Sequence, residues 1–218
     1  MSPVTKTQKL RSEKNFTYLL IVLYGGGIIA HNSPLLYSFT QSITDPLLFF
    51  TNAAVLFFAY QQSKDSRLII ACVLAAIVTF FIEVAGVATG QIFGEYAYGQ
   101  TMKWQAWGVP FVIGFNWIML ILAGLDIITK HLKALYPPLF AALLVVGFDY
   151  IMEPVAIKLD YWQWANNSIP LQNYIAWGII AFLIATIFHH TQLTTDSKIL
   201  RTYFLIQLIF FLLLRFSL

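Results

Sequence analysis

The sequence has 218 residues, of which 59% are hydrophobic and only 11% are charged. A soluble domain of this size cannot bury so much apolar surface, so the composition excludes a soluble protein and predicts an all-α, polytopic membrane protein. The formal net charge of +3 is small and gives no indication of a nucleic-acid partner. The single cysteine, Cys72, lies in an apolar run and lacks the spacing of a metal ligand.

The chain begins with a basic segment, residues 1–15, which we predict to be a cytosolic tail, and residues 16–218 are predicted to form one transmembrane domain. The apolar run at 16–30 is expected to be a membrane helix and not a signal peptide, because no small-x-small cleavage site follows it. The Gly25–Gly27 triplet within it would let another helix approach closely, or would loosen this helix. Six further spans are expected at roughly 44–61, 68–89, 108–126, 136–156, 170–188 and 200–216.

The distribution of basic residues supports seven spans with the N-terminus in the cytosol. In that topology ten Lys and Arg residues face the cytosol, whereas only Lys103, Lys158 and Arg215 lie on the other side. The expected location is the bacterial inner (cell) membrane. Asp126, Lys130 and Lys133 are assigned to a solvated cytosolic loop that helps to set this topology.

Two stretches share one plan and indicate a weak internal repeat. Residues 93–117 are polar and aromatic, turn at Pro110, and then place Asn116 and Trp117 in an apolar helix. Residues 160–177 are similar, turn at Pro170, and place Asn173 and Trp177 in the next helix. The alternative is two ordinary membrane hairpins with aromatic residues at the interface.

Acidic side chains precede both stretches, each near the outer end of an apolar run. Glu83 precedes the first stretch, and Asp149 and Glu153 precede the second, four residues apart and so on one helical face. Carboxyl groups inside a membrane lose contact with water and tend to keep a proton, which is the condition for general acid–base chemistry. The alternative is a structural or interfacial role, and Glu153 before Pro154 could simply end its helix.

We expect these acids to converge with the two asparagines, Asn116 and Asn173, in the outer half of the membrane, with Glu95 in the outer loop nearby. Several other classes are disfavoured. The last helix has no lysine for a retinal Schiff base, the four histidines do not form the clusters of metal-dependent membrane hydroxylases, and phosphate-loop and dinucleotide fingerprints are absent from the sequence.

The run FGEYAYG…WGVP…NW, followed by D…EPVA…YWQW…P…N, resembles the membrane carotenoid-biosynthesis proteins that include the carotenoid 1,2-hydratases. The likeness covers roughly residues 75–180. The related small membrane lycopene cyclases usually carry a Pro-x-Glu-Glu pair, which this sequence lacks, so the resemblance favours the hydratase branch.

The resemblance implies that the terminal double bond of a linear carotenoid such as lycopene or γ-carotene is protonated and that water captures the resulting tertiary cation. This reaction requires no redox cofactor and no metal. We assign the acid and base roles to Asp149, Glu153 and Glu83, with Asn116 and Asn173 positioning water. An aromatic set is available to face the cation, and among its members Trp117 and Trp177 are the preferred candidates. The set comprises Trp104, Trp107, Trp117, Tyr150, Trp162, Trp164 and Trp177.

Two other functions stay open at this level. A lycopene cyclase starts from the same cation but lets a neighbouring double bond capture it. A carotenoid-binding or scaffold subunit, in a complex with other carotenoid enzymes, would not need carboxylates inside the membrane.

Overall fold

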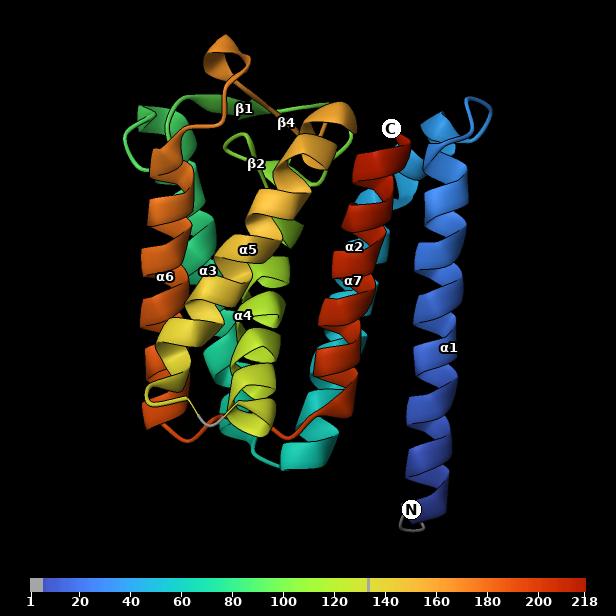
Figure 1. Ribbon diagram of the computed structural model, residues 1–218, viewed down its shortest axis with the longest axis vertical. Coiled ribbons are helices and arrows are strands. Elements are labelled where there is room, and N and C mark those ends of the chain that lie inside the picture. Colours follow the sequence, from blue (N-terminus) through green and yellow to red (C-terminus); the bar gives the residue numbers. More distant parts are fainter. Residues whose placement is uncertain (1–5, 133) are drawn as a thin grey trace.

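The computed structural model describes residues 6–132 and 134–218, which form a bundle of long helices with short strands at one end (Figure 1). Six of the helices in this part of the chain, α2 to α7, are long and apolar enough to cross a membrane. The predicted all-α membrane fold is therefore confirmed. The helices are α1 (Lys6–His31), α2 (Tyr37–Ser63), α3 (Ser66–Thr89), α4 (Phe111–His131), α5 (Pro137–Lys158), α6 (Leu171–His190) and α7 (Lys198–Ser217).

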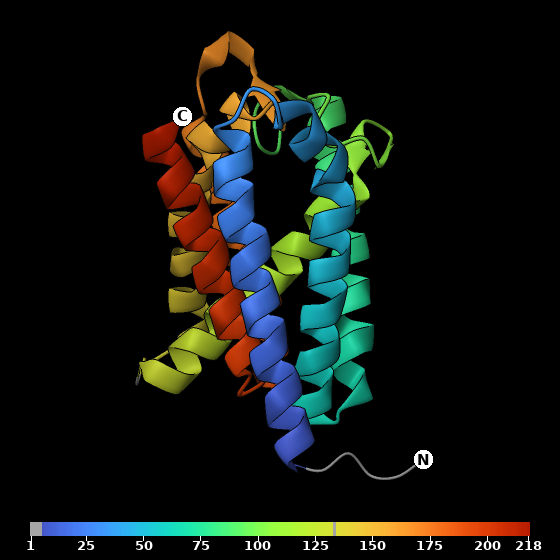
Figure 2. The same cartoon turned by 90° about the vertical axis from the view of Figure 1, so that its right-hand side faces the viewer.

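The first helix differs from the expectation. It begins at Lys6, so residues 6–15 of the predicted cytosolic tail are helical and continuous with α1, in keeping with the good helix propensity of Lys, Arg and Glu. The cytosolic location of this segment stays a prediction. Residues 1–5 of the predicted tail lie outside the described residues. Helix α1 is not among the six helices with the length and composition of a span, although it packs along α2 and α7 at the edge of the bundle (Figures 1 and 2).

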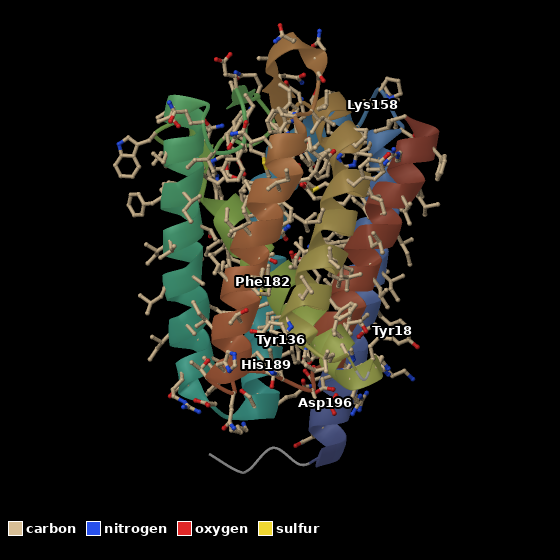
Figure 3. All side chains as sticks on the ribbon, turned by 60° about the vertical axis from the view of Figure 1, so that its left-hand side comes forward. Tyr18, Tyr136, Lys158, Phe182, His189 and Asp196 are labelled. Atoms are coloured by element: carbon tan, nitrogen blue, oxygen red, sulfur yellow. The ribbon has the colours of Figure 1, made fainter. Side chains whose placement is uncertain are left out.

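The helices run up and down, so the loops gather at two ends. The strands lie at one end, here called the strand end, together with Lys158 and the C-terminus, whereas His189 and Asp196 lie at the opposite end (Figure 3). The N-terminus of α1 also lies at that opposite end, which we call the basic end (Figure 1). The two loops with aromatic motifs therefore share one end of the molecule, as the charge distribution predicts.

The prediction of a solvated loop at Asp126 was wrong. Asp126 lies within α4, is 1% exposed, and pairs with the Arg201 guanidinium at 2.5 Å. It also accepts the backbone N–H of Ser197 just before α7, so its charge is compensated by the first turn of that helix. Lys130 is exposed and pairs with Asp196, while Lys133 lies outside the described residues.

Helix α4 is the centre of the bundle and packs against α2, α3, α5, α6 and α7. Gly114 allows α3 to approach closely, because a Cβ atom there would lie 2.8 Å from the carbonyl oxygen of Ala76. Helix α5 continues through Pro154 to Lys158, so Glu153 does not end its helix. These contacts bring α3 and α5, which carry the intramembrane acids, against the same central helix.

A two-stranded antiparallel ribbon joins the two aromatic loops across the strand end. Strand β1 (Tyr96–Tyr98) pairs with β4 (Trp162–Trp164), with Tyr96 opposite Trp164 and Tyr98 opposite Trp162. A second pair, β2 (Gln105–Ala106) and β3 (Val109–Pro110), and a 3₁₀ turn, η1 (Ala165–Asn167), complete this end. The carboxylate of Asp45 in α2 holds the first loop by accepting the backbone N–H groups of Lys103 and Trp104 at 2.5 and 3.0 Å.

The two halves of the predicted repeat have matching geometry. Helices α4 and α6 each follow a proline in extended conformation, with ψ of 132° at Pro110 and 142° at Pro170. Trp117 and Trp177 each lie six residues beyond the first residue of their helix (117 − 111 and 177 − 171). The ribbon therefore joins two units of helix, aromatic loop, proline and helix.

Candidate active site

Three carboxyl groups from two helices line one small cavity beneath the ribbon. Glu83 comes from α3, and Asp149 and Glu153 come from α5. The three residues are 3%, 0% and 2% exposed, respectively. The cavity has a volume of about 20 Å³, which is enough for about one water molecule. The surrounding protein groups must therefore provide nearly all hydrogen bonds to these acids.

Glu83 is held by two tyrosines of β1. The hydroxyl groups of Tyr96 and Tyr98 both donate to Glu83 Oε2, the second at 3.0 Å. Burial, and then the adjacent Glu83 carboxylate, raises the pKa of both tyrosines well above the usual value, so they stay protonated donors at neutral pH. Two O–H donors on one oxygen favour the ionised form of Glu83.

Glu153 is held in the same way by the opposite strand. The indole Nε1 groups of Trp162 and Trp164 donate to Glu153 Oε2 at 3.0 and 2.8 Å. Successive side chains of a strand point to opposite faces, so Y-x-Y and W-x-W direct all four aromatic donors to the same side of the ribbon, while Ala97 and Gln163 point away. An indole N–H can only donate, so these contacts also favour an ionised Glu153.

Asp149 has the fewest donors of the three acids. Asn173 Nδ2 donates to Asp149 Oδ2 at 3.0 Å and to Glu153 Oε1 at 3.3 Å. The other oxygen, Asp149 Oδ1, is buried and has no hydrogen-bond partner among the described residues. Asp149 is therefore the acid whose free oxygen is best suited to carry a transferable proton.

The two preferred tryptophans form one wall of the cavity. The rings of Trp117 and Trp177 stack with centroids 4.2 Å apart and an interplanar angle of 25°. Phe93 also stacks on Trp177, with ring centroids 5.3 Å apart. The wall thus presents aromatic π-density next to the carboxyl groups.

Three predicted site residues lie apart from this cluster. Asn116 pairs with Gln207, whose Nε2 donates to Asn116 Oδ1 at 3.0 Å. Glu95 is exposed beside the 3₁₀ turn, and Tyr150 is 58% exposed on the outside of α5, where Arg215 covers its ring. The expected convergence of all the acids and amides is corrected accordingly: the structure brings together Glu83, Asp149, Glu153 and Asn173, whose catalytic roles stay predictions.

The sequence carries a signal that separates the two asparagines. Asn173 is four residues before Trp177 and so lies on the same helical face, whereas Asn116 immediately precedes Trp117 and faces about 100° away. The site selection also missed Tyr96 and Tyr98. Their Y-x-Y spacing, matched by W-x-W in the second loop, is the period-two signal that could have identified them.

Comparison with known proteins assigns the chain to a family. A family model described as carotenoid biosynthesis protein matches residues 45–217. The chain belongs to the carotenoid biosynthesis protein family. The match begins in α2 and includes the ribbon and every carboxyl group of the cavity, whereas α1 lies outside it.

One curated relative carries the name of a hydratase. Bisanhydrobacterioruberin hydratase of Haloarcula japonica is 27% identical over 136 residues, which cover 55% of this chain and 45% of the relative. The chain thus matches less than half the length of that curated relative. No solved structure matches this family member.

Proposed function

We propose that this protein hydrates the terminal double bond of a linear carotenoid end group, as in lycopene or γ-carotene. The observation that carries the proposal is the buried set of three carboxyl groups around a cavity of about 20 Å³, one of which keeps an oxygen without a hydrogen-bond partner among the described residues. Family membership and the hydratase name of a distant relative are consistent with this chemistry.

In the proposed first step, Asp149 is the acid. Three like charges around one small cavity repel each other, so at least one proton is retained among them. Glu83 and Glu153 each accept two donors on one oxygen, which leaves Asp149 as the group that keeps the proton. The Asp149 O–H bond breaks as a C–H bond forms at the less substituted alkene carbon, and the positive charge develops at the tertiary carbon.

In the second step, a water molecule in the cavity attacks the tertiary carbon. Its oxygen forms the new C–O bond, and one of its protons passes to Glu83 or Glu153, from which the proton returns to Asp149. Overall, one water molecule is added to one double bond, without net oxidation or reduction. Asn173 contacts both acids of α5 and is proposed to orient this water.

The cation between these steps requires stabilisation. The ionised acids supply negative charge, and the stacked pair Trp117 and Trp177 supplies an aromatic face. We further propose that the N-terminus lies in the cytosol, which puts the cavity in the outer half of the membrane.

Expression in cells that accumulate lycopene tests the proposal. The products are separated by chromatography, and their masses are measured by mass spectrometry. Hydration predicts a mass gain of one water for each reacted end. An unchanged mass with a shifted retention time would identify a lycopene cyclase instead. Pigment conversion that stays intact when the three acids are replaced by amides would favour a carotenoid-binding or scaffold subunit.

A further inference from the structure

A second, much larger cavity lies next to the carboxyl groups. It has a volume of about 330 Å³ and is lined mainly by apolar surface of α1, α2, α4, α5, α7 and the two aromatic loops. Its polar lining residues are His31, Thr40, Thr44, Asn116 and Gln207. This volume is within the roughly 300–1,000 Å³ typical of small-molecule sites. Helices α1 and α2 splay apart toward the strand end (Figure 2). Residues of both helices line the cavity.

The glycine triplet of α1 helps to make this space. Gly26 and Gly27 both line the cavity, and a Cβ atom added at Gly26 would meet no atom within 4 Å. At Gly27 the nearest atom is in the ring of Phe210 in α7, at 3.2 Å. The triplet therefore leaves open volume at Gly26 and allows a close approach only at its last residue.

The large cavity opens to the surroundings of the bundle on one side and adjoins the acids on the other. Its lining includes Val22 and Phe39, which are 68% and 57% exposed on helices whose outer faces are apolar. Ile113 and Trp162 line both cavities and so form the partition between them. Trp162 is also a hydrogen-bond donor to Glu153, so this partition belongs to the acid site.

We propose that the large cavity holds the hydrocarbon end of an acyclic isoprenoid chain, which enters from the bilayer between α1 and α2 and reaches the acids past Ile113 and Trp162. This inference rests on the proposed hydration. A long polyene fits this arrangement because its end is apolar up to the reacting double bond. The rest of the chain stays in lipid at the mouth of the cavity.

The test measures pigment binding separately from conversion. Wild-type and variant proteins are purified in detergent from lycopene-accumulating cells, and bound pigment is read from the induced circular dichroism of the polyene band. Lycopene is achiral, so pigment dissolved in the micelle gives no such signal. Asp149→Asn serves as the binding reference, since it should keep the pigment bound without hydrating it.

Gly26→Leu puts a side chain into the open volume and should lower bound pigment about tenfold, the order expected for overpacking a binding site. Gly25→Leu is the matched control, because a Cβ atom there also meets nothing within 4 Å but Gly25 does not line the cavity. It should bind pigment like the wild type. If Gly26→Leu does not accumulate, Ile43→Trp fills the same cavity from α2, with Phe50→Trp on the outer face of α2 as its control.

Normal pigment binding in folded Gly26→Leu and Ile43→Trp proteins would overturn the cavity assignment, even if hydration persisted. Loss of pigment from these two variants, with Asp149→Asn still hydrating, would instead support the cavity and reject the proposed acid. Failure of the cavity assignment would therefore appear in pigment binding, whereas failure of the proposed acid would appear in hydration.

Discussion

Asn173 of α6 donates a hydrogen bond to Asp149 Oδ2 of α5 across 3.0 Å, which fixes this carboxyl oxygen. The other oxygen, Asp149 Oδ1, is buried without a hydrogen-bond partner among the described residues. The same amide nitrogen lies 3.3 Å from Glu153 Oε1 and thereby joins two acids on one helical face. This link connects Asp149 and Glu153, whereas Glu83 is held separately by Tyr96 and Tyr98, so mutagenesis can separate the roles of the three acids.

The acids should not be equivalent when each is replaced by its amide. Asp149→Asn should lower hydration by about 10³–10⁴-fold, the upper end of general acid catalysis, because an amide cannot deliver a proton to an alkene. Glu83→Gln and Glu153→Gln should retain some turnover, since water can lose its proton by other routes. The measurement is turnover in membranes at equal protein levels. Near wild-type rates for all three variants would disprove the site assignment.

The two asparagines should differ as well. Asn173→Leu removes the donor shared by Asp149 and Glu153 and should lower activity more than Asn116→Leu, whose hydrogen bonds go to Gln207 and Tyr203. For Asn116→Leu we expect a stability loss of about 0.6 kcal/mol, typical of an interhelical hydrogen bond in a membrane, and a smaller loss of activity, because Asn116 lines the large cavity and not the cavity of the acids. Turnover and thermal unfolding in detergent, measured on the same preparations, distinguish the two effects. Equal losses of activity would argue against the central role of Asn173.

The tyrosines of β1 are expected to act through Glu83. The double variant Tyr96→Phe/Tyr98→Phe removes both O–H donors that we find on Glu83 Oε2, and each hydrogen bond to a charged group is worth about 1.5–3 kcal/mol. Activity should therefore fall by at least about tenfold, while the β1–β4 backbone pairing persists. If Glu83→Gln is already present, adding the two Phe substitutions should cost little more. Fully additive losses in this double-mutant cycle would show that the tyrosines act independently of Glu83.

The topology can be read by labelling single cysteines. Lys64→Cys and Lys103→Cys place exposed thiols at the basic end and the strand end, and replacing the buried native Cys72 by alanine removes the remaining background. A membrane-impermeant reagent should label position 103 from outside intact cells and position 64 only after permeabilisation. Labelling of both positions from one side would contradict the proposed spans.

The ion pair at the basic end should matter for stability and not for chemistry. Asp126 and Arg201 have 0% and 14% exposed side chains, and removing one partner of a buried pair typically costs about 3–5 kcal/mol. Arg201→Met should therefore strongly lower the free energy of unfolding. Lys130→Met, which breaks an exposed pair with Asp196, should cost only about 0–1 kcal/mol.

The Lys130→Met variant should also change the pH dependence of the free energy of unfolding. Hydrogen bonds from Lys130 and Arg201 hold the pKa of Asp196 below its usual range. A depressed pKa contributes stability above the ordinary value of Asp, and this contribution is lost as the pH falls through the lower folded-state value. Lys130→Met should therefore flatten the acid limb of the stability curve. An unchanged acid limb would indicate that Arg201 alone is responsible for the shift.

Much of the architecture follows from the sequence because hydropathy and charge act locally. Of the seven apolar runs predicted to span, six correspond to helices with the length and composition of a membrane span, and the basic residues correctly put both aromatic loops at one end. The extent of α1 and the burial of Asp126 were missed. The burial of Asp126 depends on a neighbour distant in sequence, namely the start of α7 that compensates its charge, whereas the extension of α1 agrees with local helix propensity.

For the candidate site, the sequence by itself determined which acids lie inside the membrane and that Asp149 and Glu153 share a face, since a helix fixes relations within one segment. Only the tertiary structure decided which donors reach them. The pairing register of β1 with β4 puts two tyrosines on Glu83 and two tryptophans on Glu153, and the packing of α6 against α5 brings Asn173 to Asp149. Register and helix rotation depend on long-range packing, so no local pattern specifies them.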